Sequence, residues 1–413
     1  MWLSHPRFCR VVEDAWDCSP NQAISSFKTL ASNWNKEVFG NLFAKKRKIL
    51  ARIDGLQKAL AVRPSTFLIS LEKELSLEYT TILNQEEEFW ALKSRIDWQI
   101  LGDRNTAFCH IKTITRRKHN KIICLKDNLG NWVDFQDQVM DIILNGFKKI
   151  YLIDHLLGDS LRLWIKLGYI SHCLRLSTNV SEQEIHKVMF SLKPYKAPGM
   201  DKLHAGFFRH FWNVLGQSVI EEILAVFHSK HIPNYLNQTL VVVIPKREGP
   251  KTLSYFRPIS LCSTIYNVIS KITVNRIRPH MHHLISPLQA AFILGRKGLD
   301  NIIAQEVLNT MEKKKGRTGT IGLKIDLEKA FDRLEWSFIH EVLVHFNFPK
   351  NIIDIIMACI SSTSVSILFN GGKLEPFTPT RGICQGDPLS PYIFILCLEY
   401  LGLLILDKIA DNT

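Results

Sequence analysis

The sequence predicts a mixed α/β (α+β) fold whose first quarter is helical. Between about residues 23 and 100, apolar side chains recur at helical spacing, as at Phe27 and Trp34. Residues 240–245 are an apolar run with the length of a buried strand, and residues 319–334 change from strand alternation to helical spacing. A chain of 413 residues, 46% of them apolar, can bury a core and is long enough for two or three units.

Two charged features mark the helical first part. The run Lys45–Lys48 is either a nuclear import signal or the solvated face of a helix, and the second explanation is the commoner one. Residues 68–100 mix glutamates with leucines, which fits a coiled coil or a strut between domains. We assign no catalytic residue to this part of the chain.

A basic segment follows between Trp98 and Ile122. Its cations are interleaved with apolar residues, a pattern typical of a surface that contacts an RNA backbone. The whole chain has 52 Lys and Arg against 39 Asp and Glu, a net charge of +13, which favours a polyanionic partner. The candidate nucleic-acid-binding residues are Lys112, Arg116, Arg117, Lys118 and Lys121.

Residues 240–261 predict a hairpin-like element with two cations. Lys246 follows the apolar strand, and Arg257 stands directly before Pro258. Two cations on such an element suit the binding of a triphosphate, although both side chains are also compatible with simple solvation.

Asp326 stands where a predicted strand joins a predicted helix. Ile321, Leu323 and Ile325 alternate with other residues, and helical spacing begins at Leu327. A carboxylate on rigid backbone at such a joint suits Mg²⁺, which binds a few oxygen ligands and keeps some of its waters. The alternative is an ordinary helix N-cap, where aspartate is favoured.

The segment RGICQGDPLSPYIF, residues 381–394, predicts a tight turn that leads into a helix. Gly386 lets backbone approach a ligand closely. Pro388 and Pro391 stiffen the start of the apolar helix. In addition to Asp326, we take Gln385 and Gly386 of this turn as candidate site residues.

Five motifs in one order carry a resemblance to a known family. They are IPK, FRPISL, SPLQAAFILGR, KIDLEKAFDRL and RGICQGDPLSP. In this order they closely resemble the reverse transcriptase of plant non-LTR (LINE-type) retrotransposons, an RNA-directed DNA polymerase. The resemblance extends from about Trp98 to the last residue and more loosely to Met1.

The resemblance implies a role for each matched residue. Asp326 matches the first catalytic aspartate of the palm, a ligand to both Mg²⁺ ions, and the Leu327 carbonyl matches a further metal ligand. Phe331 matches the aromatic residue that lies under the sugar and rejects a ribose 2′-hydroxyl. The nucleotide-binding residues that it implies are Lys246, Arg257, Phe331, Gln385 and Gly386.

Structural alternatives accompany these roles. Phe331 at helical spacing fits an ordinary core aromatic, and Lys246 and Arg257 fit a solvated surface. We expect Glu328 to lie on a solvated helix face and Asp332 to be a structural hydrogen-bonding group rather than a metal ligand. Because the motifs occur together, we favour the functional interpretation of the matched residues.

The resemblance also implies partners and a domain order. The partners are an RNA template, a DNA primer and a dNTP, without a membrane. Residues 1–96 are a helical connector after an absent endonuclease domain, and residues 97–180 are an N-terminal extension that touches RNA. Residues 181–413 are right-hand polymerase fingers and an incomplete palm, whose antiparallel sheet lacks the second catalytic carboxylate strand; thumb and RNase H are also missing.

The number of carboxylates bears on activity. Two divalent ions that lie ~4 Å apart need at least two carboxylates. The family supplies the second from an Ala-Asp-Asp turn that is not reached before Thr413. We therefore expect two-metal nucleotidyl transfer as the function of the family and inactivity of this chain as a truncated fragment. The alternative is a non-catalytic retroelement relic that at most binds RNA.

Two residues depart from the pattern of the family. Cys384 stands where an arginine is usual, so a cation is missing beside Gln385. Lys202 stands where a glycine is usual, which places a side chain where the backbone needs a positive φ.

The remaining signals concern the compartment. The nine cysteines show no zinc spacing, which predicts free thiols in a reducing setting. The first ten residues lack the apolar core of a secretory signal, so we expect a nuclear or cytoplasmic protein that is not secreted. Residues 389–406 are strongly apolar but carry Pro391 and Glu399, which favours a palm helix with an exposed apolar face over a membrane anchor.

Overall fold

A computed structural model describes most of the chain, in two compact units. The described residues are 2, 3, 5, 7–16, 20–94, 106–153, 176, 178–287, 289, 291–296, 306–311, 313 and 325–410. One unit comprises residues 1–121, 193–196 and 204–219, and the other residues 122–192, 197–203 and 220–413. Compact units need not coincide with functional domains, so the three-part division of the chain stays a prediction.

The first unit is helical in its described residues. In chain order it contains α1 (Phe8–Ala15), α2 (Pro20–Trp34), the π-helical turn η1 (Asn35–Phe39), α3 (Leu42–Val62), α4 (Thr66–Ser94), α5 (Thr106–Asn120) and α8 (Ala205–His210). Helix α9 (Trp212–Ser229) begins in this unit and ends in the other. The helical prediction for residues 23–100 is confirmed up to Ser94, and the rest lies outside the described residues.

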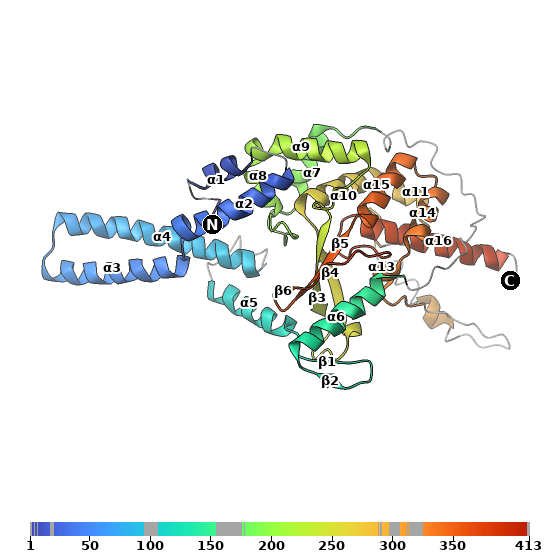
Figure 1. The fold of residues 1–413 in the computed structure, drawn as a ribbon, viewed down its shortest axis with the longest axis horizontal. Helices are drawn as coiled ribbons and strands as arrows, with labels where there is room; N and C mark the ends of the chain where they lie inside the picture. The colour runs from blue at the N-terminus through green and yellow to red at the C-terminus, as the bar shows by residue number, and fades with distance from the viewer. Residues whose placement is uncertain are drawn as a thin grey trace. The chain divides into compact units, whose positions relative to one another are not determined.

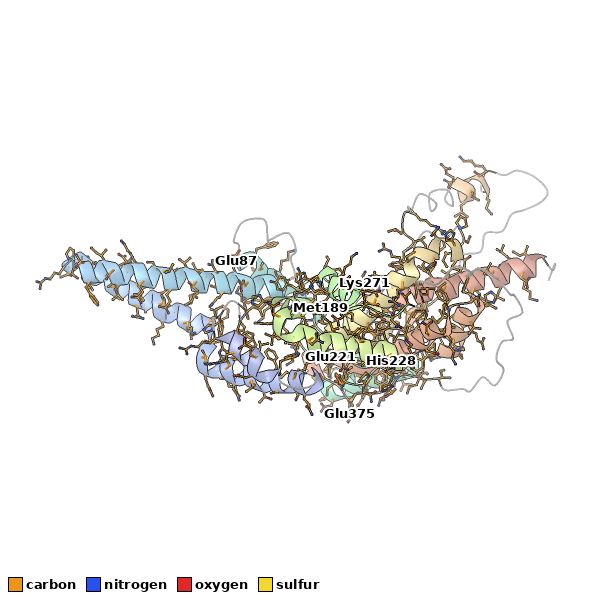
Figure 2. The ribbon with its side chains drawn as sticks, turned by 90° about the horizontal axis from the view of Figure 1, so that it is seen from above. Glu87, Met189, Glu221, His228, Lys271 and Glu375 are labelled. Carbon is orange, nitrogen blue, oxygen red and sulfur yellow. The ribbon has the colours of Figure 1, made fainter. Side chains whose placement is uncertain are left out.

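Helices α3 and α4 pack side by side as a long hairpin (Figures 1 and 2). Leu42, Ile49 and Ile82 form its buried seam, since they recur on one face of each helix. In the basic run, Lys46 pairs with Glu86 of α4, with 2.6 Å between Nζ and Oε2. The run therefore lies on a largely solvated helix, and its role as an import signal stays a prediction.

The second unit is built on a small mixed sheet. Its strands are β3 (Gln238–Pro245), β4 (Phe256–Leu261), β5 (Ser364–Phe369) and β6 (Gly372–Lys373), in the spatial order β4-β3-β5-β6. The predicted hairpin of β3 and β4 is confirmed, and its register pairs Ile244 with Arg257. The prediction of a wholly antiparallel sheet is wrong, because β3 and β5 run parallel.

Helices surround this sheet. They are α6 (Gln136–Tyr151), α7 (Glu182–Ser191), α10 (Thr264–Ile277), α11 (Met281–Leu284), α13 (Ala330–Arg333), α14 (Trp336–His345), α15 (Lys350–Ser361) and α16 (Ser390–Ala410), with 3₁₀ turns η4 (Leu253–Tyr255) and η5 (Arg278–His280). A two-stranded hairpin, β1 (Leu125–Lys126) and β2 (Trp132–Val133), precedes α6. Helix α6 packs Ile143 and Phe147 against Val241 of β3 and Ile367 of β5, so its C-terminal end is fixed beside the sheet.

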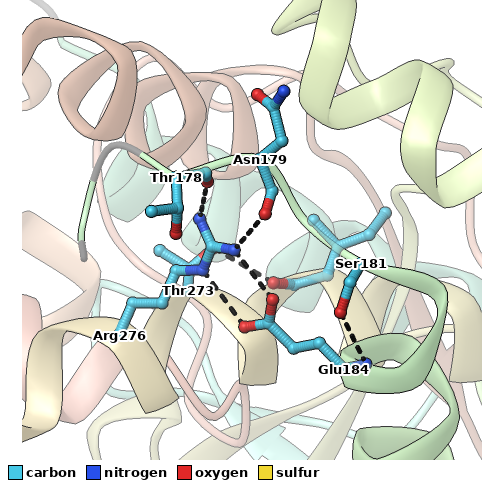
Figure 3. A network of polar contacts seen from close by, with 7 residues as sticks. Thr178, Asn179, Ser181, Glu184, Thr273 and Arg276 are labelled. Carbon is cyan, nitrogen blue, oxygen red and sulfur yellow. Dashed lines mark hydrogen bonds and ion pairs between the residues drawn. The ribbon is translucent and has the colours of Figure 1, made fainter. Parts of the chain in front are cut away.

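An arginine of α10 holds the start of α7 (Figure 3). The Arg276 guanidinium donates to both oxygens of Glu184, at 3.1 and 2.7 Å, and to the carbonyls of Thr178 and Asn179. The Ser181 hydroxyl accepts from the Glu184 amide at 3.2 Å and caps the helix. This arrangement ties two sequence-distant elements of the unit together.

Three further predictions concern local backbone. Lys202 has φ of +61°, as its place in a glycine position predicted. The predicted helix from Leu327 is wrong in its extent, because Lys329 is left-handed (φ +52°) and α13 covers only Ala330–Arg333. The strand predicted before Asp326 falls on residues 319–324, outside the described residues, and Ile325 itself is irregular.

Within the described residues, no helix combines the length and apolar character needed to cross a bilayer. Helix α16 instead has a buried first half, with Ile393 and Leu396 in the core, and exposed Ile405, Leu406 and Ile409 near its end. The predicted exposed apolar face is therefore confirmed at the end of this helix.

Candidate nucleotide and template site

Asp326 lies in an exposed, irregular segment directly before a tight turn. Its neighbours Ile325 and Leu327 are also exposed, and the turn at Glu328 and Lys329 leads into α13. The left-handed backbone at Lys329 separates Asp326 from the helix, so Asp326 is not the N-cap of α13. The carboxylate is therefore presented on the surface of the unit.

The Gln385 loop is bound to two distant parts of the unit by three main-chain hydrogen bonds. Ile383 N donates to Phe331 O at 2.8 Å, and Gly382 N donates to Leu334 O at 2.7 Å. On the other side, Ser260 N of β4 donates to Gln385 O at 2.7 Å. The loop thus brings together the Phe331 segment and β4, two motifs that the sequence had only placed in order.

Arg381 anchors the same loop to the end of α6. Its guanidinium donates to the carbonyl of Ile150 at 2.8 Å and to that of Lys149 at 3.1 Å. A cation at the last carbonyls of a helix satisfies acceptors that have no partner inside the helix. The loop is therefore a fixed part of the fold.

Two features of the backbone at position 386 require a glycine. Its φ is +122°, which side-chain-bearing residues rarely adopt, and an added Cβ would lie 2.7 Å from Ser260 O. The contact is with backbone, so the space cannot be gained by a side-chain rotation. Gly386 permits the close approach of the loop to β4, which is a structural role beside any contact with a ligand.

Two side chains donate hydrogen bonds to Asp332. The Tyr151 hydroxyl donates to Oδ1 at 2.9 Å, and Gln385 Nε2 donates to Oδ1 at 3.1 Å and to Oδ2 at 3.0 Å. The prediction of a structural hydrogen-bonding role for Asp332 is confirmed. Burial raises the pKa of Asp332 to about 6, although the hydrogen bonds from Tyr151 and Gln385 and the charges of Lys329 and Lys246 favour its ionised form.

Cations lie near this carboxylate. Lys246 follows β3 and is exposed, and its amide donates to Tyr255 O at 2.8 Å. Arg257 is likewise exposed on β4. Lys329 is half-buried beside Asp332 and Lys246, and burial lowers its pKa. Of the two predicted triphosphate ligands, Lys246 is thus electrostatically coupled to the Asp332 cluster.

Phe331 packs against a ring of α16. Its ring centroid lies 4.6 Å from that of Phe394, with 21° between the planes. Phe331 is only half-buried. Both the packing alternative and the role under a sugar are compatible with that placement, so the second stays a prediction.

Asp387 caps a turn directly before α16 and is not placed for metal binding. It is buried, and its oxygens accept from the hydroxyls of Tyr266 and Ser270 and from Leu389 N at 3.3 Å. In the parts of the chain that the structure describes, no group of three or more His, Cys, Asp or Glu side chains is arranged for a metal ion. The exposed Asp326 carboxylate and the adjacent Leu327 carbonyl nevertheless offer the hard oxygen donors that Mg²⁺ prefers, which fits one partial site.

Cys384 replaces a cation with a neutral thiol beside Gln385. Its thiol is hydrogen-bonded to that of Cys262, and this bond together with burial raises the pKa of Cys262. Thr239 Oγ1 lies 3.7 Å from the Cys262 sulfur. Position 384, where the family usually has an arginine, is thus part of a small hydrogen-bonded cluster with Cys262 and Thr239.

The predicted RNA-contact residues lie on or just after α5, in the other unit. Lys112, Arg117, Lys118 and Lys121 are exposed. Arg116 differs, because its guanidinium donates to the Ser94 carbonyl at 3.0 Å and to the carbonyl of Lys93 at the end of α4. Arg116 therefore caps a helix, and an RNA contact from α5 depends on the exposed cations.

Sequence reasoning missed Tyr151 and Lys329. Tyr151 follows Phe147 at helical spacing on α6, so the sequence marks it as an ordinary core aromatic. Only the packing of α6 against the sheet brings its hydroxyl to Asp332. Lys329 stands within the KIDLEKAFDRL motif, and its charge three residues before Asp332 is the signal in the sequence that could have identified it.

The chain is similar to known proteins over much of its length. Residues 244–412 match the family model described as reverse transcriptase (RNA-dependent DNA polymerase). The chain is 24% identical over 311 residues to a Xenopus laevis protein described as the transposon TX1 uncharacterized 149 kDa protein, covering 75% of this chain and 24% of that protein. It is 27% identical over 227 residues to the retrovirus-related Pol polyprotein from type-2 retrotransposable element R2DM of Drosophila melanogaster, covering 55% and 21% respectively.

A shorter match is closer in sequence. Over 35 residues the chain is 59% identical to an uncharacterized mitochondrial protein of Arabidopsis thaliana, covering 8% of this chain and 29% of that protein. The chain spans about a quarter of the length of these relatives. Together the matches show that residues 244–412 are similar to reverse transcriptase domains, and that more of the chain is similar to proteins of R2 and TX1 elements.

Proposed function

We propose that this chain supplies the fingers and part of the palm of an RNA-directed DNA polymerase, and that it binds an RNA template, a DNA primer and a dNTP. The observation that carries the proposal is the attachment of the Gln385 loop to both β4 and the Phe331 segment, which follows the exposed Asp326 by five residues in the sequence. This attachment gathers the matched motifs into one unit. The short match to an Arabidopsis thaliana protein supports a plant element as its source.

Each residue has a task in this proposal. Lys246 and Arg257 neutralise the triphosphate, because exposed cations on a rigid hairpin bind phosphate without rearrangement. Phe331 supports the sugar from its stack on Phe394, and Gln385 and Gly386 line the nucleotide and template pocket. Asp326 and the Leu327 carbonyl hold a divalent ion, Mg²⁺ in our proposal, which when bound neutralises phosphate charge and orients it.

A second candidate function is RNA binding without catalysis. The exposed cations Lys112, Arg117, Lys118 and Lys121 favour it, because phosphate contacts alone give sequence-independent affinity. Two-metal chemistry needs a second carboxylate, and Asp332 and Asp387 are both engaged in buried hydrogen bonds. In either case we place the protein in the nucleus or cytoplasm.

Binding of a labelled RNA-template/DNA-primer hybrid tests the proposal. Fluorescence anisotropy of the 413-residue chain should show salt-sensitive binding that tightens when Mg²⁺ and the next templated dNTP are added. Lys246→Met or Arg257→Met should each weaken the effect of the dNTP by about tenfold or more, since a charge-assisted contact contributes ~1.5–3 kcal/mol. Lys373→Met, at an exposed cation on β6, is the matched control.

Primer extension on the same hybrid separates the two candidates. Incorporation that disappears in Asp326→Ala would mean that a carboxylate within these 413 residues completes the metal site. Binding that tightens with dNTP, without incorporation, would support a polymerase site that lacks its second carboxylate. Binding that neither responds to dNTP nor changes in Lys246→Met would favour the RNA-binding alternative.

A further inference from the structure

The hydrogen bonds at Asp332 restrict how Gln385 can meet a ligand. A carboxylate in its ionised form only accepts hydrogen bonds, so the amide nitrogen of Gln385 must be the atom that faces it. That nitrogen contacts both carboxylate oxygens, at 3.1 and 3.0 Å. Among the described residues none donates to the amide oxygen of Gln385, and this acceptor is the group that remains for a ligand.

The carboxylate itself is fixed by its surroundings. The Tyr151 hydroxyl donates to Oδ1 at 2.9 Å from the end of α6, and Asp332 is only 1% exposed. The main chain on both sides is also held, by the bond from Ile383 N to Phe331 O and by that from Ser260 N to Gln385 O. Rotation of the Gln385 amide by 180° would place its oxygen against the carboxylate oxygens of Asp332. This orientation is unfavourable because all of these atoms are hydrogen-bond acceptors and repel one another.

We propose that Asp332 and Tyr151 are positioning residues that lock the Gln385 amide with its oxygen toward the ligand, so that the site selects a hydrogen-bond donor on the bound nucleic acid. This inference rests on the proposed function for its ligand. Two of the donors with the required chemistry are the 2′-hydroxyl of an RNA strand and the 2-amino group of guanine in a minor groove. A ligand that lacks the donor leaves the amide oxygen without a partner, which costs ~1–3 kcal/mol for a buried group.

Protonation of Asp332 should release this lock. The charged or titratable groups that face it are Tyr151 from α6, Lys246 after β3 and Lys329 before α13. A protonated carboxyl has one donor, which can serve the amide oxygen of a rotated Gln385. The selectivity for a donor should therefore decline as the pH falls below about 6, where burial has placed the pKa of Asp332.

The first arm of the test needs no ligand. In the full chain with ¹⁵N-labelled glutamine, the Gln385 side-chain amide, assigned by its loss in Gln385→Met, should exchange slowly with water at pH 7.5. Exchange should accelerate below about pH 6, in Tyr151→Phe and in Asp332→Asn. Tyr235→Phe is the matched control, because it removes another bond from a tyrosine hydroxyl to a carboxylate, that with Glu222. An amide that exchanges equally fast in the wild type and in Asp332→Asn would overturn the positioning role.

The second arm measures selectivity. Two ratios of Kd values are measured. The first compares a DNA template with an RNA template on the same DNA primer, and the second compares inosine with guanine at the first base pair. The wild type should prefer one donor-bearing ligand by about tenfold, and Asp332→Asn and Gln385→Met should reduce that ratio to near one. A template effect identifies the 2′-hydroxyl, and an inosine effect identifies the 2-amino group. Equal ratios in the wild type and Asp332→Asn would refute donor selection. A wild type that binds no hybrid would refute the proposed function. The amide exchange would still decide the positioning role in that case.

Discussion

Replacing Asp332 with asparagine should remove a pH-dependent part of the free energy of unfolding. The pKa of this buried carboxyl is raised from its usual 3.8 to about 6. At 1.36 kcal/mol for each tenfold change in proton affinity, the difference corresponds to about 3 kcal/mol. The sign follows from linkage: the folded state binds the proton more tightly, so the contribution is fully present below about pH 3.8 and is lost as the pH rises through about 6.

Urea unfolding of the wild type and Asp332→Asn at several pH values between about 4 and 7.5 measures this contribution. The difference in unfolding free energy, wild type minus variant, should fall by about 2–3 kcal/mol across that range. Hydrogen bonds lost in the variant add an offset that does not depend on pH. The slope of the free-energy difference against pH therefore reports only the protonation of Asp332. Asp134→Asn, which makes the same change at an exposed carboxyl before α6, is the matched control variant.

A flat difference across the range would refute the reasoning, because it would mean that folding does not change the proton affinity of Asp332. A difference that rises with pH would also refute it. In that case the hydrogen bonds from Tyr151 and Gln385 would outweigh burial and lower the pKa of the carboxyl.

Five further substitutions test other parts of the structure. Arg276→Met removes the guanidinium that holds the start of α7 and should lower the unfolding free energy by about 2–3 kcal/mol, seen as a lower urea midpoint. Gly386→Ala should cost more than about 1 kcal/mol because its φ is +122° and its Cβ would meet backbone, whereas Gly402→Ala, with open space on α16, should be neutral or stabilising in the same urea titration. Arg116→Met should destabilise α4, whose last carbonyls it caps. Lys118→Met should leave the melting curve unchanged and lower the salt dependence of RNA binding by the equivalent of about one phosphate contact.

Local patterns explain what the sequence predicted of the fold. The hairpin of β3 and β4 is formed by neighbouring segments whose apolar runs are visible in the sequence. The positive φ of Lys202 could also be predicted, since a turn fixes its backbone within a few residues. The parallel pairing of β3 with β5 could not, because more than a hundred residues separate the strands and no turn sets their direction.

The site was predicted to a similar depth. Motif order placed Asp326, Gln385 and Gly386 in one functional unit, and Asp332 was expected to hydrogen-bond. The partners of Asp332 could not be named from the sequence. The helical spacing of Tyr151 predicts an ordinary core residue, and its contact with Asp332 depends on how α6 packs in the folded unit. The left-handed Lys329 was missed for a related reason, since the helical spacing around it continues without interruption in the sequence.

The chemistry of Asp332 argues that its place in the fold is tied to a ligand. At neutral pH its ionised form lowers the stability of the folded state, by the same burial that raises its pKa. A neutral asparagine would accept from Tyr151 without that cost, but it could also donate to the amide oxygen of Gln385 and would admit both amide orientations. Only the ionised carboxylate enforces one orientation. The destabilisation measured by the pH series and the selectivity measured by the template series should therefore disappear together in Asp332→Asn, and loss of one without the other would separate the fold from the function at this residue.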